Sequence, residues 1–211
     1  MARKGILFVV SAPSGSGKTT LCQRLIKDFS GKRVLVPSVS VTTRKPRKGE
    51  RHGEDYFFIS KPEFLRRRRS GQFLEWAKVL DNFYGTPKDF IRLHVGQGTD
   101  VLLNIDVQGA LKIKRMLRRS GSSSLCRKGK KGRGYRAVFI FIKPPTFDEL
   151  KHRLRRRSTE SDVEITRRLD LAKKEMSHRF VREYDYVVLN DKIAKGLDKL
   201  KEIVKHERER K

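Results

Sequence analysis

The chain has 211 residues, which suits one α/β domain with small excursions or two small domains. Its 51 Lys and Arg outnumber its 24 Asp and Glu, and the formal net charge of +27 attracts polyanions, so nucleotides, nucleic acids and anionic membranes are all permitted partners. Two cysteines, Cys22 and Cys126, are too few for a disulfide framework, and no apolar run approaches the length of a transmembrane helix. We therefore expect a soluble, cytoplasmic protein without membrane contact.

The first predicted element is a strand, Ile6–Val10, that runs directly into a loop of small residues. Its apolar residues show no polar alternation, which is typical of a strand buried on both faces. The loop reads A-P-S-G-S-G-K-T-T, and apolar residues at helical spacing follow it. Strand, glycine-rich loop and helix in this order are the context that a phosphate-binding loop requires.

The residue types in this loop have chemical reasons. Gly15 and Gly17 let the backbone approach a phosphate and adopt positive φ. Lys18 would reach the β- and γ-phosphates, and the Thr19 hydroxyl would ligate Mg²⁺. The usual pattern, G-x-x-x-x-G-K-[ST], has glycine where this chain has Ala12. A plain serine- and glycine-rich turn is the alternative, and Lys18 with Thr19 favours phosphate binding over it.

Short strands and short helices follow between residues 38 and 96. We predict strands at 38–43, 56–59 and 73–79, a turn at 82–86, a helix that Ser60 caps and Gly71 ends, and a helix from Pro87 to about Gly96. This mixture differs from the pattern on either side. It predicts an inserted substrate-binding subdomain.

The rest of the chain alternates buried strands with helices. Strands are predicted at 101–105, 137–142 and 184–189, and helices at 107–117, 147–157, 163–179 and the C-terminus. The alternation predicts an α/β fold with a parallel sheet and helices on both faces, whose functional residues gather at the carboxyl ends of strands. The loop after Ser11, Asp106 and Asn190 all lie at such ends.

Residues 118–136 interrupt this pattern with a basic segment that contains no acidic residue and almost no apolar one. Such a composition predicts a disordered, solvated loop. A polyanion-binding arm is the alternative.

Several charged residues outside the loop have a pattern that suits phosphate chemistry. Asp106 closes the strand V-L-L-N-I-D, and in phosphate-loop enzymes such an aspartate holds Mg²⁺, often through water. Arg44 and Arg47 flank a proline, which suits a phosphate monoester gripped by bidentate contacts. Arg153 and Arg157 lie four apart on one helix, where a bound polyphosphate would relieve their repulsion; in so basic a chain a chance pair is an equal alternative.

Other residues suit a purine. Glu75 lies between apolar neighbours in F-L-E-W-A, where a half-buried carboxylate would accept from the adjacent N1–H and amine of guanine. Adenine offers no such pair of donors, and a surface glutamate is the alternative. Tyr56 and Tyr84 border turns, where their hydroxyls would bind phosphate or their rings would simply pack.

Taken together, these motifs resemble the guanylate kinase family from about Ile6 to Val204. The similar segments are S-A-P-S-G-S-G-K-T, S-V-S-V-T-T-R-K-P-R-K-G-E, G-E-D-Y-F-F, F-L-E-W-A, N-F-Y-G-T-P, N-I-D-V-Q-G-A, F-I-F-I-K-P-P and Y-D-Y-V-V-L-N-D. The resemblance implies a P-loop kinase core at 1–37, 97–143 and 161–211, a GMP-binding subdomain at 38–96 and a helical lid at 144–160.

The resemblance also implies Mg²⁺-dependent phosphoryl transfer from ATP to GMP or dGMP, giving ADP and GDP. ATP would be held by Ala12, Pro13, Ser14, Gly15, Ser16, Gly17, Lys18, Thr19, Thr20 and Asn190. GMP would be held by Ser40, Arg44, Arg47, Tyr56, Glu75, Tyr84, Thr86 and Asn104. The catalytic residues would be Lys18, Arg44, Arg153, Arg157 and Arg168, and the metal would lie at Thr19 and Asp106.

Besides Ala12, the chain departs from the family pattern at two places. Asn104 stands where the family usually has Glu or Asp, and the basic segment at 118–136 is longer than the usual link. Three rival functions stay open: another small-phosphate kinase on the same scaffold, such as a ribose bisphosphate kinase; a guanylate kinase-like binding module; and a nucleic-acid-binding protein, suggested by the net charge.

Overall fold

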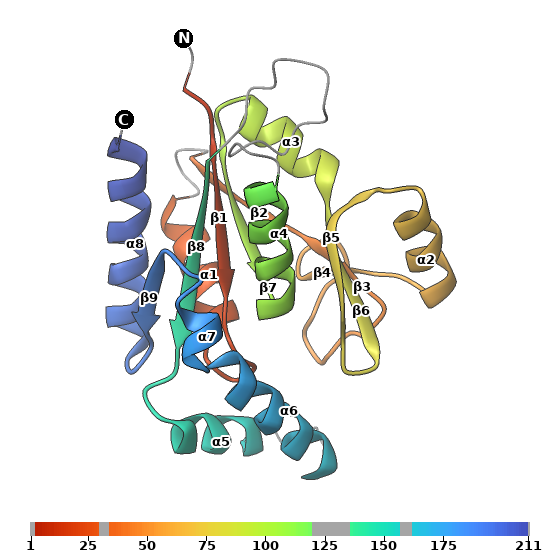
Figure 1. Ribbon diagram of the computed structural model, residues 1–211, viewed down its shortest axis with the longest axis vertical. Helices are drawn as coiled ribbons and strands as arrows, with labels where there is room; N and C mark the ends of the chain where they lie inside the picture. The colour runs from red at the N-terminus through yellow and green to blue at the C-terminus, as the bar shows by residue number, and fades with distance from the viewer. Residues whose placement is uncertain (1–2, 30–33, 120–135, 157–161, 211) are drawn as a thin grey trace.

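The computed structural model describes residues 3–29, 34–119, 136–156 and 162–210, with helices around two sheets (Figure 1). Most of the predicted basic loop, together with Cys126 and the proposed catalytic Arg157, lies outside the described residues. None of the helices in the described part is both long and apolar enough to cross a membrane.

A five-stranded parallel sheet forms the centre, in the order β2-β7-β1-β8-β9. The strands are β1 (Ile6–Ser11), β2 (Leu35–Ser38), β7 (Asp100–Ile105), β8 (Arg136–Lys143) and β9 (Tyr186–Leu189). All six residues of β1 are buried, as its unbroken apolar run predicts. This sheet with helices on both faces confirms the predicted fold class.

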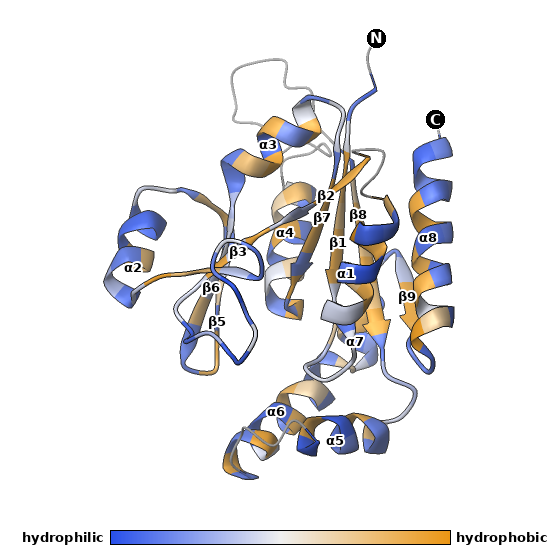
Figure 2. Cartoon of the chain, turned by 180° about the vertical axis from the view of Figure 1, so that it is seen from behind, coloured by the Kyte–Doolittle hydropathy of each residue, from blue (hydrophilic) through white to orange (hydrophobic). Residues whose placement is uncertain are grey.

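Alternate residues of β1 point to opposite faces of the sheet, and different helices cover each face. Phe8 and Val10 pack with α1 (Lys18–Phe29) and α8 (Ile193–Glu209). Leu7 and Val9 pack with α3 (Lys88–Gly96) and α4 (Val107–Arg119). Figure 2 shows the strands of this sheet largely in the hydrophobic colour. The core therefore consists of two apolar layers with β1 between them.

A smaller sheet lies to one side, in the order β4-β3-β6-β5. Its strands are β3 (Ser40–Thr42), β4 (Tyr56–Phe58), β5 (Phe73–Val79) and β6 (Asn82–Pro87). Helix α2 (Lys61–Arg69) packs on it through Phe64, whose ring stacks on Phe73 with the centroids 4.6 Å apart. The Ser60 hydroxyl caps this helix, as predicted, by accepting the amide of Glu63 at 3.4 Å.

Two helices, α5 (Phe147–Arg155) and α6 (Asp162–Glu175), project beyond the carboxyl edge of the central sheet (Figure 1). They pack together through Leu150, Leu154 and Ala172. The short helix α7 (His178–Val181) follows, so the predicted single helix at 163–179 is wrong. The helix is interrupted after Glu175, and Ser177 is the N-cap residue of α7.

One other predicted element has different bounds and one is wrong. The strand predicted at 38–43 is β3, at Ser40–Thr42, whereas Ser38 ends β2, a strand of the central sheet that was not predicted. Pro37 is tolerated inside β2 because that strand lies at the sheet edge. The turn predicted at 82–86 is strand β6. The reversal occurs just before it, where Leu80 adopts a φ of 54° without a glycine to signal it.

The beginning of the chain is tied to the sheet by Asp100. This fully buried carboxylate accepts the amide of Ile6 at 2.8 Å and contacts Arg3 Nη2 at 2.9 and 3.0 Å. Because Arg3 is 40% exposed, water can replace its part of the pair. The Ile6 amide, by contrast, lies in the core and has no access to water.

We predict that Asp100→Ala lowers the free energy of unfolding by about 2–3 kcal/mol, because a buried amide loses its charged acceptor. Urea unfolding followed by circular dichroism measures the change. The exposed Asp170 on α6 provides the control, and Asp170→Ala should change stability by less than about 0.5 kcal/mol. Equal effects of the two variants would contradict the role of Asp100.

Candidate active site

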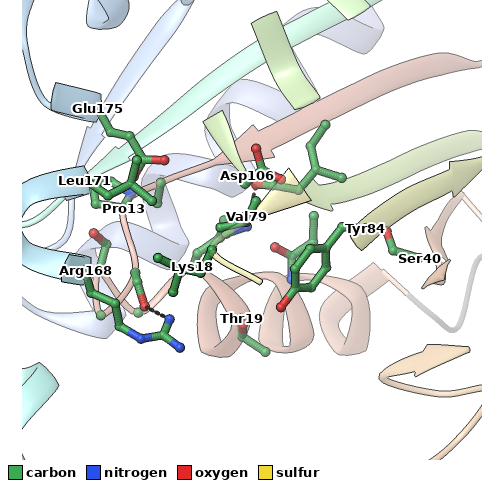
Figure 3. Close-up of a pocket in the computed structure, with 18 of the residues that line it drawn as sticks. Pro13, Lys18, Thr19, Ser40, Val79, Tyr84, Asp106, Arg168, Leu171 and Glu175 are labelled. Carbon is green, nitrogen blue, oxygen red and sulfur yellow. Dashed lines mark hydrogen bonds between the residues drawn. The ribbon is translucent and has the colours of Figure 1, made fainter. Parts of the chain in front are cut away.

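A cavity of about 190 Å³ lies at the carboxyl end of β1 and β7, between the central sheet, the small sheet and α6 (Figure 3). Most of the predicted site residues line it. They are Ala12, Pro13, Ser14, Gly15, Ser16, Gly17, Lys18, Thr19, Thr20, Ser40, Arg47, Tyr56, Glu75, Tyr84, Asn104, Asp106 and Arg168. The structure therefore brings the loop at 12–20 and six of the eight proposed GMP residues to one cavity, whose lining does not include Arg44 or Thr86.

The glycine-rich loop is held by specific backbone geometry. Gly15 and Gly17 have φ values of 88° and 80°, in the region that favours glycine. A Cβ at Gly17 would also collide with the Asn190 amide, which donates to the Ser16 carbonyl at 2.7 Å. Ala12 is not among the described residues with positive φ, so alanine fits there without strain.

Lys18 begins α1 and lies inside the cavity. Its ammonium donates to the carbonyl of Ile105, at the end of β7, at 2.5 Å. Burial lowers the pKa of Lys18, and the nearby Cys22, Asp106 and Glu175 oppose that shift. The ammonium group therefore lies at the end of β7, and the neighbouring acidic groups compensate its positive charge only in part.

Asp106 and Thr19 both line this cavity and supply oxygen atoms to it. Asp106 Oδ1 accepts the amide of Gly109 at 2.9 Å, which fixes the carboxylate at the start of α4. Within the described residues, no group of three or more His, Cys, Asp or Glu side chains is placed to enclose a metal ion. A cation that keeps its own waters and substrate oxygens needs no such cage.

The inner wall of the cavity contains buried acceptors without partners. Glu75 is 8% exposed, and its Oε1 accepts the Thr86 hydroxyl at 2.7 Å. Its Oε2, together with Ser40 Oγ and Asn104 Oδ1, has no hydrogen-bond partner in the described structure. Buried polar atoms are nearly always paired, so these three atoms indicate a ligand. The site requires Gly109 as well, since a Cβ there would lie 2.8 Å from Glu75 Oε2.

Glu75 is also electrostatically unusual. Burial raises its pKa to about 7, and the negative charge of Asp106 adds to the shift. The hydrogen bond from Thr86 and the charge of Lys112 act in the opposite direction. Near neutral pH this carboxyl is therefore only partly ionised, and a ligand that donates hydrogen bonds to it would favour the ionised form.

The small sheet and the loop that follows β3 carry the residues predicted to bind a phosphate. Tyr56 and Tyr84 lie edge to face with their centroids 6.1 Å apart, and burial raises the pKa of Tyr56 to about 12. Arg44 lines two neighbouring cavities instead of the central one, and Arg47 lines all three. Arg44 pairs with Glu50, a residue that the sequence analysis did not select.

The proposed lid and adenine residues lie around the loop. Arg168 on α6 donates to Ser14 Oγ at 3.4 Å and to Glu164 at 2.8 Å. Arg153 on α5 lies outside the cavity lining, where it pairs with Glu149 at 2.7 Å and reaches the Asn190 carbonyl at 3.4 Å. The Asn190 side chain is fully buried against the loop, and its contact with adenine stays a prediction.

Six residues that line the cavity were not predicted from the sequence. They are Val79, Leu80, Gly85, Ile105, Leu171 and Glu175. Glu175 is 6% exposed, and burial raises its pKa to about 8, with Asp106 adding to the shift and Lys18 opposing it. A usable signal existed, because Arg168, Leu171 and Glu175 are spaced along one face of a helix.

Comparisons with known proteins agree on one family. A family model described as Guanylate kinase matches residues 4–120 and 128–207. A guanylate kinase of Caldanaerobacter subterraneus subsp. tengcongensis is 43% identical over 202 residues, which are 96% of this chain and 87% of the relative. A guanylate kinase of Wolbachia sp. subsp. Brugia malayi is 44% identical over 205 residues, 97% of this chain and 94% of the relative.

Solved structures agree with the sequence relatives. The crystal structure of guanylate kinase from Anaplasma phagocytophilum is similar, with a TM-score of 0.73 and 35% sequence identity. The similarity covers 98% of this chain and 87% of that one, so it includes both sheets and the two projecting helices.

We predict that Asn190→Ala raises the KM for ATP roughly tenfold, because the buried Ser16 carbonyl loses its donor and the loop loosens. Asn190→Asp should raise the KM for ATP further, since a carboxylate would then face the Ser16 carbonyl. Steady-state kinetics with each substrate varied in turn measure the change. The KM for GMP should stay within about twofold; an equal rise in both KM values would contradict a role confined to the loop.

Proposed function

The chain belongs to the guanylate kinase family, and we propose that it transfers the γ-phosphoryl group of ATP to GMP or dGMP, giving ADP and GDP. One observation supports this most strongly. A complete phosphate-binding loop and three unpaired buried acceptors, on Ser40, Glu75 and Asn104, face the same cavity. An ATP phosphate tail and a purine with adjacent donors would each find their partners there.

The loop would bind the phosphates of ATP. The backbone amides at the start of α1 would donate to phosphate oxygens, and the helix dipole would add to that attraction. Lys18 would exchange its bond to the Ile105 carbonyl for phosphate oxygens. Their negative charge would favour the protonated amine, which burial disfavours. Arg168 lies against the loop at Ser14 and would neutralise charge on the transferred group.

Mg²⁺ fits the oxygen atoms that this chain offers. The Thr19 hydroxyl and the Asp106 carboxylate are hard oxygen ligands on one cavity, and Mg²⁺ prefers such ligands together with waters and substrate phosphates. When bound, the ion would neutralise charge on the β- and γ-phosphates. Asp106 is already oriented by the Gly109 amide, so the protein provides one fixed ligand.

GMP would lie between the two sheets. Ionised Glu75 would accept from the guanine N1–H and amine, while Thr86 holds the other carboxylate oxygen in place. Arg44, Arg47, Tyr56 and Tyr84 would hold the phosphate. Because that phosphate is already an anion, no general base is needed, and the protein acts by positioning and charge neutralisation.

The rival functions find less support. A ribose bisphosphate would leave Glu75 Oε2 and Asn104 Oδ1 without donors of the right geometry. A binding module would have no need of Lys18, Thr19 and Asp106 around one cavity. Polyanion binding by residues 118–136 and a cytoplasmic location stay predictions from composition.

The direct test is ADP production from ATP with GMP, dGMP, AMP and ribose bisphosphate in turn. We predict turnover with GMP and dGMP only, and a fall in kcat of roughly a hundred- to a thousandfold in Lys18→Met, since one charged group on the phosphates is lost. Lys27→Met, at an exposed position on the same helix, is the matched control. Absence of magnesium-dependent turnover with any acceptor, in a folded sample, would disprove the function.

The pKa of Glu75 predicts a pH dependence for the acceptor. Guanine binds the ionised carboxylate, and burial raises that pKa to about 7, so the KM for GMP should rise about tenfold for each pH unit below 7. Initial rates between pH 5.5 and pH 8.5 would measure this. In Glu75→Gln the slope should fall to that of the GMP phosphate, whose second pKa lies at about 6, and an unchanged slope between pH 6.5 and pH 7.5 would assign the titration to another group.

The same shift has a consequence for stability with a defined sign. A carboxyl whose folded pKa is raised contributes stability that is complete below its unfolded pKa of 4.5 and is lost as pH rises through about 7. The unliganded protein should therefore lose stability over this interval, and GMP should restore it, because the ligand pairs the ionised group.

A further inference from the structure

Glu50 holds the arginine that the acceptor phosphate would meet. Its two carboxylate oxygens lie 2.8 and 3.0 Å from Arg44 Nη2. The side chains are only 13% exposed at Arg44 and 19% exposed at Glu50, so this ion pair is well shielded from water. A pair this sheltered is worth more than an exposed surface pair, and it orders both side chains.

The carboxylate is itself fixed by the backbone of the same loop. Glu50 Oε2 accepts the amide of Arg47 at 2.7 Å, and the amide of Glu50 donates to the Arg47 carbonyl at 3.0 Å. Gly49 has a φ of 86°, which turns the chain so that Glu50 points back toward Arg44. Glu50 thus connects both arginines of the predicted phosphate site, one through its guanidinium and one through its backbone.

Other contacts complete the fixed position of the Arg44 guanidinium. Nη1 donates to the Lys45 carbonyl at 2.6 Å. The guanidinium carbon lies 5.5 Å from the centre of the Tyr56 ring and 5.8 Å from that of Phe58. The loop, one carboxylate and two aromatic rings therefore set the plane of this side chain before any ligand arrives.

We propose that Glu50 is a positioning residue for the acceptor phosphate, acting through Arg44 and the Arg47 backbone. The proposal rests on the proposed function, since it identifies Arg44 as a phosphate ligand. A free arginine loses much rotamer entropy when a ligand fixes it, and Glu50 removes that cost before binding. The Glu50 carboxylate would remain in place when phosphate binds, because the Arg47 amide holds it independently of Arg44.

The opposite role is that Glu50 occupies the phosphate position and competes with the ligand. Both roles use the same contact, but they predict opposite signs. Removing the charge of Glu50 weakens GMP binding if the residue positions Arg44, and strengthens it if the residue competes. The binding measurement therefore decides between them without reference to catalysis.

The test uses Glu50→Gln, which keeps the size of the side chain and removes its charge. Calorimetry with GMP should show affinity reduced roughly ten- to a hundredfold, as expected when the Arg44 guanidinium is no longer held in its binding position. Affinity for guanosine, which lacks the phosphate, should be unchanged, and so should the KM for ATP. Glu54→Gln is the matched control on the same loop, because Glu54 is 57% exposed and pairs with Arg51 at the surface.

A double-mutant cycle shows whether Glu50 acts through Arg44. In Arg44→Ala the further change Glu50→Gln should reduce GMP affinity much less than it does in the wild-type protein, because only the contact with the Arg47 backbone is left to lose, whereas two independent effects would add. Glu50→Asp retains the charge on a shorter side chain and should recover part of the affinity; it also serves if Glu50→Gln fails to fold. Tighter binding of GMP, equal losses for GMP and guanosine, or full additivity in the cycle would each overturn the proposal.

The outcomes also separate this proposal from the function. If wild-type protein binds GMP but transfers no phosphoryl group, the function fails and the positioning role is still decided by affinity. If wild-type protein turns over GMP and Glu50→Gln binds it as well as wild type, the function stands and the positioning role fails.

Discussion

The position of β1 at the centre of the sheet is the constraint on which the site depends. This strand pairs with β7 on one side and β8 on the other, and both of its faces are covered by helices. Because all the strands are parallel, the loop after β1 and Asp106 after β7 emerge at the same edge. Lys18 and Asp106 therefore meet in one cavity, although 87 residues separate Lys18 from the neighbouring Ile105. The apolar packing of a buried strand thus determines where the charges of the site lie.

Those charges are held in an environment that disfavours them. Burial lowers the pKa of Lys18 and raises those of Glu75 and Glu175 to about 7 and about 8. Each shift moves a group toward its neutral form, and each would be reversed by a ligand of suitable charge or hydrogen-bonding pattern. The folded chain keeps these groups in place at a cost in stability, so that the substrates meet partners that are already oriented.

Local sequence was sufficient for the parts of the site that depend on backbone chemistry. Gly15, Gly17 and Lys18 are placed by a loop whose strand and helix are both evident from apolar spacing. The division of 35–42 between two sheets was not predictable, because β2 depends on pairing with the distant β7. The site residue Glu175 was missed for a similar reason. Its position facing Lys18 follows from the packing of α6, and the surrounding sequence gives only the spacing of one helical face.

The asparagine at position 104 is consistent with the charge already present in the cavity. The charge of Asp106 raises the pKa values of Glu75 and Glu175, and a further carboxylate at 104 would add to such shifts. Asn104 offers an acceptor, its unpaired Oδ1, without adding negative charge. A neutral acceptor would take a hydrogen bond from the purine without itself having to ionise. Among the proposed guanine contacts, Glu75 would then be the one carboxylate that the base has to keep ionised. In the proposed function, recognition of the guanine donors would therefore depend more on Glu75 than it would with a second carboxylate beside it.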